Sequence, residues 1–363
     1  MNDRSRILAA VGATVLLFVA VQIGALALVE PFDQSGRQAV ENPQDPTNSI
    51  FYVGIMLVAT ALMLAAFRYD LEGLIRLLLV GVSVMISWYV FAELVPAVVE
   101  PIAPAGVADA LAILVSLAVG AALLWYPEWY VIDAAGIVMG AGAAALFGIS
   151  FGLLPALLLL SVLAVYDAIS VYGTEHMLDL AEGVMDLKIP VVLVVPTTLS
   201  YSYLAAGSAE DALEDESAAD GGRPVAERED AGDDVTATAE SGDGAAENDD
   251  GAATTDDGAS PDDDVLERDA FFIGLGDAVI PTVLVASAAS FLEAGAIAVS
   301  GIALNLAALG ASLGTIAGLL VLMYMVIEGR AHAGLPLLNG GAIVGYLLGA
   351  LASGVSIATA VGF

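Results

Sequence analysis

Residues 129–173 read WYVIDAAGIVMGAGAAALFGISFGLLPALLLLSVLAVYDAISVYG, and this apolar tract decides the fold class. A single helix of that length would extend about 68 Å, roughly twice the thickness of a membrane. The tract therefore predicts two membrane-spanning helices. Gly148, Gly152 and Pro155 mark the turn that we expect between them.

Apolar segments on both sides of this tract are also long enough to cross a bilayer, which takes about 20 residues. The chain of 363 residues is 58% hydrophobic, and its mean hydropathy is +0.84, more than a soluble domain of this size needs. The first segment is predicted to remain as an anchor, because it is long for a signal-peptide core. We therefore expect nine spans: the two within 129–173, and further spans near 7–29, 50–67, 77–99, 107–126, 271–292, within 294–327, and at 335–361.

Basic residues predict the orientation of these spans. With the N-terminus in the cytoplasm, nine of the ten Lys and Arg residues lie on the cytoplasmic side, and only Arg37 lies outside. The sequence thus predicts an all-α polytopic protein of the cell membrane, with nine transmembrane helices, a cytoplasmic N-terminus and an extracytoplasmic C-terminus.

The net charge of −33 is concentrated in one insert. Residues 209–269 contain 23 Asp and Glu residues against three arginines, and they include almost no large apolar side chains. Such a composition cannot bury enough apolar surface to fold, so we predict a disordered, cytoplasmic acidic loop at 208–268. It would separate helices 1 to 6, in 1–207, from helices 7 to 9, in 269–363. A solvated spacer is favoured over a binding site for a basic partner.

Two aspartates stand inside apolar segments, Asp167 in the sixth predicted span and Asp277 in the seventh. A charged group at the bilayer centre costs roughly 2.5–3.5 kcal/mol on insertion scales, so an intramembrane acid indicates a functional site. The sixth span is expected to run inward and the seventh outward. The two carboxyl groups can therefore meet at a similar depth near the cytoplasmic side.

A pair of carboxyl groups about 3 Å apart does not ionise fully, so one member stays protonated while the other is charged. The charged member can take a proton from water while the neutral member donates to the carbonyl of the bond under attack. A separation above about 12 Å would require a large rearrangement first. Cysteine is absent and histidine occurs twice, which excludes thiol nucleophiles and Cys/His zinc sites. We expect no metal and no cofactor.

The residues around the two acids carry a family resemblance. Tyr166-Asp167 and Gly274-Leu275-Gly276-Asp277, in adjacent predicted spans, resemble the two catalytic motifs of the presenilin and signal peptide peptidase family of intramembrane aspartyl proteases, as found in archaeal presenilin homologues. The resemblance implies that Asp167 and Asp277 are catalytic and that the substrates are transmembrane polypeptides in the lipid bilayer. It implies no nucleic-acid partner and names no accessory subunit. Tyr166 could hydrogen-bond within the site or pack as an aromatic side chain.

A third motif of that family, Pro-Ala-Leu, lines the substrate cleft at the start of the ninth span. Here the matching stretch is Leu335-Pro336-Leu337-Leu338, so Leu337 replaces the alanine. Independently of the resemblance, glycines before Asp277 would let a polypeptide approach closely, because they lack a Cβ. The residues expected to bind substrate or support the site are Tyr166, Gly274, Leu275, Gly276, Leu335, Pro336, Leu337 and Leu338.

The apolar segment 189–195 is too short to cross a membrane and is rich in β-branched residues. It could form an interfacial patch, a half-helix, or a short strand beside the site that pairs with an extended peptide. Other glycine pairs are expected only to pack helices, and Glu93 and Asp133 are expected at membrane interfaces. These glycine pairs are Gly136 and Gly140, Gly310 and Gly314, and Gly341 and Gly345.

Transport is the alternative function from another class. Asp167 and Asp277 could relay protons or bind a cation in a transporter, which would predict an inverted repeat that the sequence does not show. The stretch 148–152 matches the Gly-x-Ser-x-Gly pattern of serine hydrolases, but no strand is predicted before it. Prepilin-type peptidases share a Gly-x-Gly-Asp acid, yet they lack the Tyr-Asp partner in the preceding span. An aspartyl protease is therefore the favoured interpretation.

Overall fold

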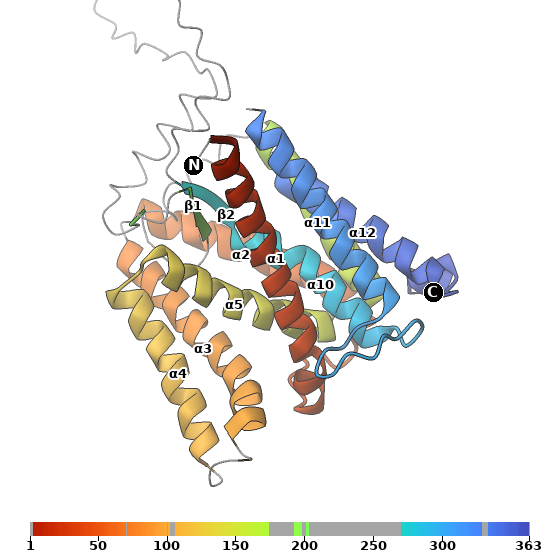
Figure 1. Ribbon diagram of the computed structural model, residues 1–363, viewed down its shortest axis with the longest axis horizontal. Helices are drawn as coiled ribbons and strands as arrows, with labels where there is room; N and C mark the ends of the chain where they lie inside the picture. Colours follow the sequence, from red (N-terminus) through yellow and green to blue (C-terminus); the bar gives the residue numbers. More distant parts are fainter. Residues whose placement is uncertain are drawn as a thin grey trace, which may run out of the picture.

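The computed structural model describes residues 3–69, 71–99, 101, 106–173, 192–197, 201–202, 270–328 and 333–362, and this part of the chain is mostly helical (Figure 1). Eight of its helices are long and apolar enough to cross a membrane, and α10 is a further apolar helix of 17 residues. A polytopic, mostly helical membrane fold is thereby confirmed. The helices are α1 (Asp3–Gln34), α2 (Thr47–Arg68), α3 (Glu72–Val99), α4 (Val107–Trp125), α5 (Trp129–Ser150), α6 (Leu153–Gly173), α10 (Leu275–Phe291), α11 (Leu306–Ile327), α12 (Gly334–Ala352) and α13 (Ile357–Ala360).

The division of 129–173 into two helices is confirmed, since α5 ends at Ser150 and α6 begins at Leu153. The turn is fixed from outside, because the N–H of Gly152 donates to the carbonyl of Pro43 at 2.8 Å. A side chain at Gly152 would overlap that of Gln44. The connection between α1 and α2 therefore covers this turn.

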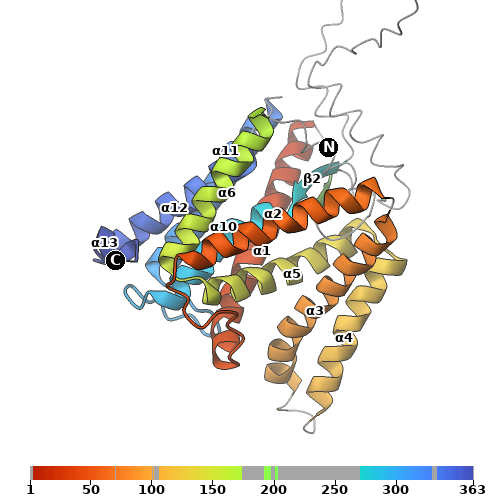
Figure 2. The same cartoon turned by 180° about the vertical axis from the view of Figure 1, so that it is seen from behind.

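Helix α5 lies at the centre of the described bundle and is the most buried of the eight long helices. It packs against α1, α3 and α10, while α2 and α6 lie on the side of the bundle that faces the viewer in Figure 2. Its glycines allow these close contacts. A Cβ at Gly140 would lie 3.3 Å from both Val21 of α1 and Val279 of α10, and one at Gly142 would meet Val90 of α3.

Helices α11 and α12 form a closely packed pair on the side of the bundle away from α3 and α4 (Figure 1). Their backbones are in contact, because a Cβ at Gly314 would overlap the carbonyl of Gly341, and one at Gly345 would overlap the carbonyl of Gly310. The helix-packing role predicted for these four glycines is confirmed.

A two-stranded antiparallel sheet pairs β1 (Val192–Pro196) with β2 (Ala270–Gly274). The strand predicted as one alternative for 189–195 is thus confirmed from residue 192 onward, whereas 189–191 lie outside the described residues. The predicted start of the seventh span at Phe271 is wrong. Residues 270–274 pair with β1, and α10 begins only at Leu275.

The predicted extent of the last span, 335–361, is also wrong. Helix α12 ends at Ala352, and Gly354 adopts a positive φ of 79° that turns the chain before the short α13. The preceding helix, α11, begins at Leu306, where the side chain of Asn305 accepts the N–H of Ala308 at 2.8 Å. The acidic segment 208–268 lies outside the described residues.

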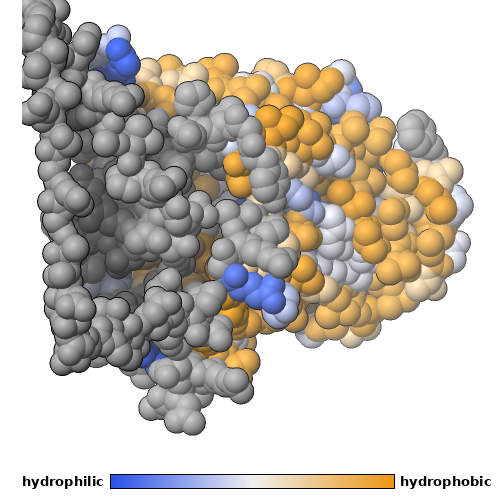
Figure 3. Space-filling view, turned by 90° about the horizontal axis from the view of Figure 1, so that it is seen from above, coloured by the Kyte–Doolittle hydropathy of each residue, from blue (hydrophilic) through white to orange (hydrophobic). Residues whose placement is uncertain are grey.

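Apolar side chains dominate the described part of the face shown in Figure 3, as expected for contact with lipid. Exposed aromatic residues gather where α4 meets α5, at Trp125, Tyr126 and Tyr130, which is typical of a membrane interface. Glu93 of α3 pairs with Arg37, which follows α1, at 2.7 Å. This ion pair satisfies two charged groups that the sequence places near one end of their spans.

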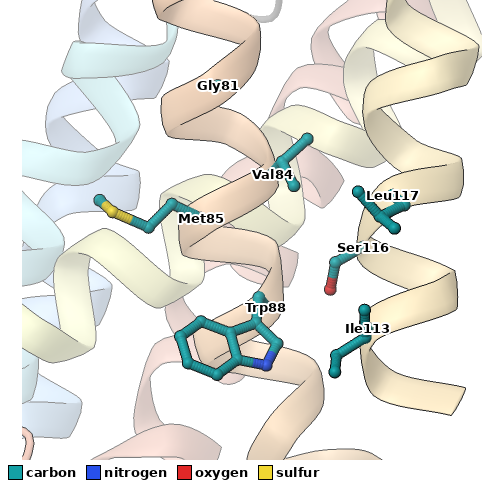
Figure 4. A pocket seen from close by; sticks show the side chains of 7 residues that line it. All are labelled: Gly81, Val84, Met85, Trp88, Ile113, Ser116 and Leu117. Carbon is teal, nitrogen blue, oxygen red and sulfur yellow. The ribbon is translucent and has the colours of Figure 1, made fainter. Parts of the chain in front are cut away.

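A pocket of about 300 Å³ lies between α3 and α4, between Met85 and Trp88 on one helix and Ile113 and Ser116 on the other (Figure 4). The hydroxyl of Ser116 donates to the carbonyl of Ala112 in its own helix. The pocket is therefore an apolar groove between two helices and includes neither Asp167 nor Asp277.

Candidate active site

Asp167 lies in the second half of α6 and is buried, with 6% of its surface exposed. One of its carboxyl oxygens, Oδ2, accepts the backbone N–H of Leu335 at 3.0 Å. Leu335 is the second residue of α12, and the first N–H groups of a helix have no partner inside that helix. The carboxyl group of Asp167 thus caps α12 and is oriented by it.

Asp277 is the third residue of α10, directly after the end of β2, and is partly buried. An acidic side chain is favourable in a first helical turn, because the N-terminal end of a helix carries partial positive charge. Its Oδ2 lies 3.4 Å from the position that a Cβ would occupy at Gly274. The strand and the helix start thus fix Asp277 from its own chain.

The two carboxyl groups converge on the start of α12. Oδ2 of Asp277 lies 3.7 Å from the Cβ position of Gly334, and Oδ2 of Asp167 bonds the N–H of the next residue, Leu335. The Cβ position of one residue and the backbone nitrogen of the next are about 3 Å apart. The sum of these three distances therefore limits the separation of the two oxygens to about 10 Å.

Gly334 is a member of this site that the sequence analysis missed. Its Cβ position faces Asp277, and the N–H of its neighbour, Leu335, donates to Asp167. The signal that could have found it is its place directly before Leu335-Pro336. A side chain there would enter the space between the two acids.

The two predicted glycines beside Asp277 are exposed at the surface of the described chain. Among the described residues, apart from the immediate chain neighbours and the backbone of the same helical turn, Asp277 is the residue within 4 Å of a Cβ at Gly274, and Ile280 is the one that close to a Cβ at Gly276. Backbone is therefore accessible on this side of Asp277.

Leu275, between those glycines, points the other way. It is buried, and its Cδ1 lies 3.2 Å from the Cβ position of Gly140 and 3.8 Å from that of Gly136, both on α5. Leu338 is fully buried in the same core cluster. These two leucines support the site from behind and do not line its open side.

The remaining predicted residues lie closer to the surface. Leu335, Pro336 and Leu337 are half-buried at the start of α12, and Tyr166 is 40% exposed on α6. Among the described residues, no hydrogen bond joins the Tyr166 hydroxyl to either carboxyl group.

Asp133, expected at an interface, is buried, and its Oδ1 accepts the N–H of Val194 in β1 at 2.8 Å. A second acidic residue of this region, Glu128, accepts the hydroxyl of Ser202 at 2.7 Å. Hydrogen bonds at the start of α5 thus fix β1 and Ser202, which follows it.

Comparisons with known proteins show which family this fold belongs to. The family model described as signal-peptide peptidase, presenilin aspartyl protease matches residues 15–355. The chain is also similar to a presenilin family intramembrane aspartate protease solved in two space groups. The C222 structure has a TM-score of 0.57 and 29% identity, over 94% of this chain and 99% of that chain. The P2 structure has a TM-score of 0.56 and 30% identity, over 94% and 97%. No curated protein matched the sequence.

Proposed function

Because the chain belongs to the family of signal-peptide peptidases and presenilin aspartyl proteases, and is an intramembrane aspartyl protease, we propose that Asp167 and Asp277 are its catalytic pair. The observation that carries this proposal is the convergence of both carboxyl groups on consecutive residues, Gly334 and Leu335. The two carboxyl oxygens are at most about 10 Å apart. Only a separation above about 12 Å would require a large rearrangement of the helices before both acids could contact one water molecule.

The proposed reaction uses one water molecule and two carboxyl groups. The charged member takes a proton from water, and the resulting oxygen nucleophile attacks the peptide carbonyl, whose oxygen is protonated by the neutral member. The carbon–nitrogen bond of the tetrahedral intermediate then breaks. The carboxyl group that took the proton from water gives it to the leaving nitrogen, and the other carboxylate takes a proton from a hydroxyl group of the intermediate, so both acids return to their starting states. The hydrogen bond from Leu335 supports this scheme because it holds Asp167 in one orientation.

The substrates of this family are membrane-embedded proteins, and we propose that the scissile segment reaches the acids in an extended form. The exposed backbone at Gly274 and Gly276 supports this, because a helix encloses its peptide bonds whereas an extended chain presents them. A lining role is proposed for Tyr166, Leu335, Pro336 and Leu337, with Leu337 narrowing the site relative to alanine. Leu275 and Leu338 are proposed as supporting residues.

We further propose nine spans, with α10 as the seventh, a cytoplasmic N-terminus, an extracytoplasmic C-terminus and a location in the cell membrane. The apolar sequence of α10 supports its inclusion, and the distribution of basic residues supports the orientation. In this arrangement 1–207 and 269–363 are the membrane parts, and the acidic segment 208–268 is a cytoplasmic loop, as its composition indicates.

The comparisons give no support to a transporter. The test is to reconstitute the protein in liposomes with a model transmembrane peptide. We expect cleavage that is lost in Asp167→Ala and in Asp277→Ala. It should persist in Asp109→Ala, which removes an exposed acid in the first turn of α4. Ion or proton uptake without cleavage, lost in the same two variants, would overturn the proposal.

A further inference from the structure

The carboxyl group of Asp133 has no part in the proposed reaction, yet it is buried and accepts a backbone hydrogen bond from Val194. Burying a carboxyl group is costly unless a donor satisfies it. The donor here belongs to β1, 61 positions away in the chain. The bond therefore joins α5 to the sheet that precedes Asp277.

This bond depends on the register of the strand. In an antiparallel pair, successive residues point their N–H groups alternately toward and away from the partner strand. Val194 lies opposite Phe272 and donates to Asp133, so its N–H points away from β2. A slip of one residue would bring an N–H that points toward β2. A slip of two in one direction would bring Pro196, which has no N–H.

A second contact lies one helical turn further along α5. A Cβ at Gly136 would lie 2.9 Å from Cδ2 of Leu193 and 3.8 Å from Cδ1 of Leu275. Residues three apart on a helix share a face, so Asp133 and Gly136 present one surface to the sheet. That surface holds β1 and the residue two positions before Asp277.

The sheet leads directly into the helix that carries Asp277. β2 ends at Gly274, and Asp277 follows in the first turn of α10. A shift of one strand residue corresponds to about 3.3 Å. A misplacement of reacting groups by about 1 Å can reduce the rate of hydrolysis roughly a hundredfold. A shift of the sheet would move Asp277 relative to the substrate and would therefore change which peptide bond is hydrolysed fastest.

We propose that Asp133 is a positioning residue, which fixes the β1–β2 sheet against the catalytic pair and thereby determines which peptide bond of the substrate is hydrolysed. The proposal rests on the proposed function of Asp167 and Asp277. Asp133 acts through the backbone of Val194 and touches no reacting atom.

The experiment measures the masses of the fragments cut from one transmembrane peptide, which give the cleavage positions. Asp133→Ala removes the acceptor, whereas Asp133→Asn keeps one. We expect the share of the main product to fall at least twofold in Asp133→Ala, with new cleavage at neighbouring bonds, and to stay unchanged in Asp133→Asn.

Val194→Pro tests the same bond from the strand. Proline removes the N–H and is tolerated where that group points away from the partner strand. We expect it to reproduce the altered products of Asp133→Ala, and the double variant to resemble either single variant, because both remove one interaction.

Ser287→Ala is the matched control for stability. Ser287 is buried in α10 and donates to the carbonyl of Phe151 at 2.8 Å, at the α5–α6 turn. This variant should lower the unfolding temperature and leave the cleavage positions unchanged. The proposal is overturned if Asp133→Ala and Val194→Pro also keep the wild-type positions. Failure of the proposed function is a separate result, since it would appear as cleavage that survives Asp167→Ala.

Discussion

The backbone N–H of Leu335 donates to the carboxyl group of Asp167 at 3.0 Å, which ties the first turn of α12 to the second half of α6. The preceding residue, Gly334, faces Asp277. Two consecutive residues thus contact two acids that are far apart in the chain. The start of α12 is therefore part of the site, and four of the predictions below concern α12 or the helix packed against it.

Removing the Leu335 donor should reduce catalysis more than stability. Leu335→Pro deletes the N–H in the first turn of a helix, where proline is tolerated. A hydrogen bond to a charged group contributes about 1.5–3 kcal/mol, which corresponds to a roughly 10- to 150-fold loss of kcat. The measurement is peptide cleavage at saturating substrate. Leu335→Ala keeps the N–H and is the control, so an equal loss in both variants would contradict the role of the bond.

A methyl group at Gly334 should interfere with the acid pair. Its carbon would lie 3.7 Å from Oδ2 of Asp277 and 3.4 Å from Leu322, which are ordinary contacts, so Gly334→Ala should fold. It would occupy space that the proposed water and peptide need, and we expect kcat to fall about tenfold or more. Gly340 lies on the same helix, and no described residue outside its own helical turn and chain neighbours lies within 4 Å of a Cβ there. Gly340→Ala should keep wild-type activity, and a similar loss there would show that the helix as a whole was perturbed.

The α11–α12 pair should not tolerate side chains at its glycines. In Gly314→Ala the new methyl group would overlap the carbonyl of Gly341, and backbone cannot move aside as a side chain can. Overpacking costs about 1–3 kcal/mol, so the midpoint of thermal unfolding in detergent should fall. Gly54→Ala, on α2, is the control: the added carbon has no neighbour within 4 Å among the described residues outside its own helical turn, so the midpoint should stay unchanged. An unchanged midpoint in Gly314→Ala would mean that the two helices pack less closely than described.

Asn339 should be more sensitive to aspartate than to alanine. Its side-chain amide donates to the carbonyl of Leu160 at 3.0 Å, and the residue is fully buried. Asn339→Ala loses that bond, at about 1–3 kcal/mol. Asn339→Asp keeps the shape but buries a carboxyl group against a carbonyl oxygen, which costs more. Unfolding midpoints should therefore rank wild type, alanine, aspartate, and an aspartate variant as stable as wild type would contradict this arrangement.

The membrane fold could be predicted from the sequence because apolar length is a local property. The two helices within 129–173 needed only the span of a bilayer and the turn residues near Gly152. The approach of Asp167 and Asp277 followed from the opposite directions of successive spans. Neither inference required knowledge of a distant contact.

The parts that could not be predicted depend on tertiary partners. Residues 271–273 are as apolar as the residues of the helix that follows. A short apolar run of this kind does not distinguish a strand from a helix. Their pairing with β1 makes these residues a strand. The contact of Asp133 with Val194, and that of Gly334 with Asp277, likewise exist only once separate segments are brought together.

The central claim is that Asp167 and Asp277 act as one unit on one water molecule. Its most direct test is the residual rate of peptide cleavage in Asp167→Asn, Asp277→Asn and the double variant, measured with the same reconstituted protein and substrate. Groups that act together lose nearly all their effect when either is removed. We predict that all three variants have the same residual rate within about threefold. A single variant that cleaves a hundred times faster than the double variant would contradict the claim.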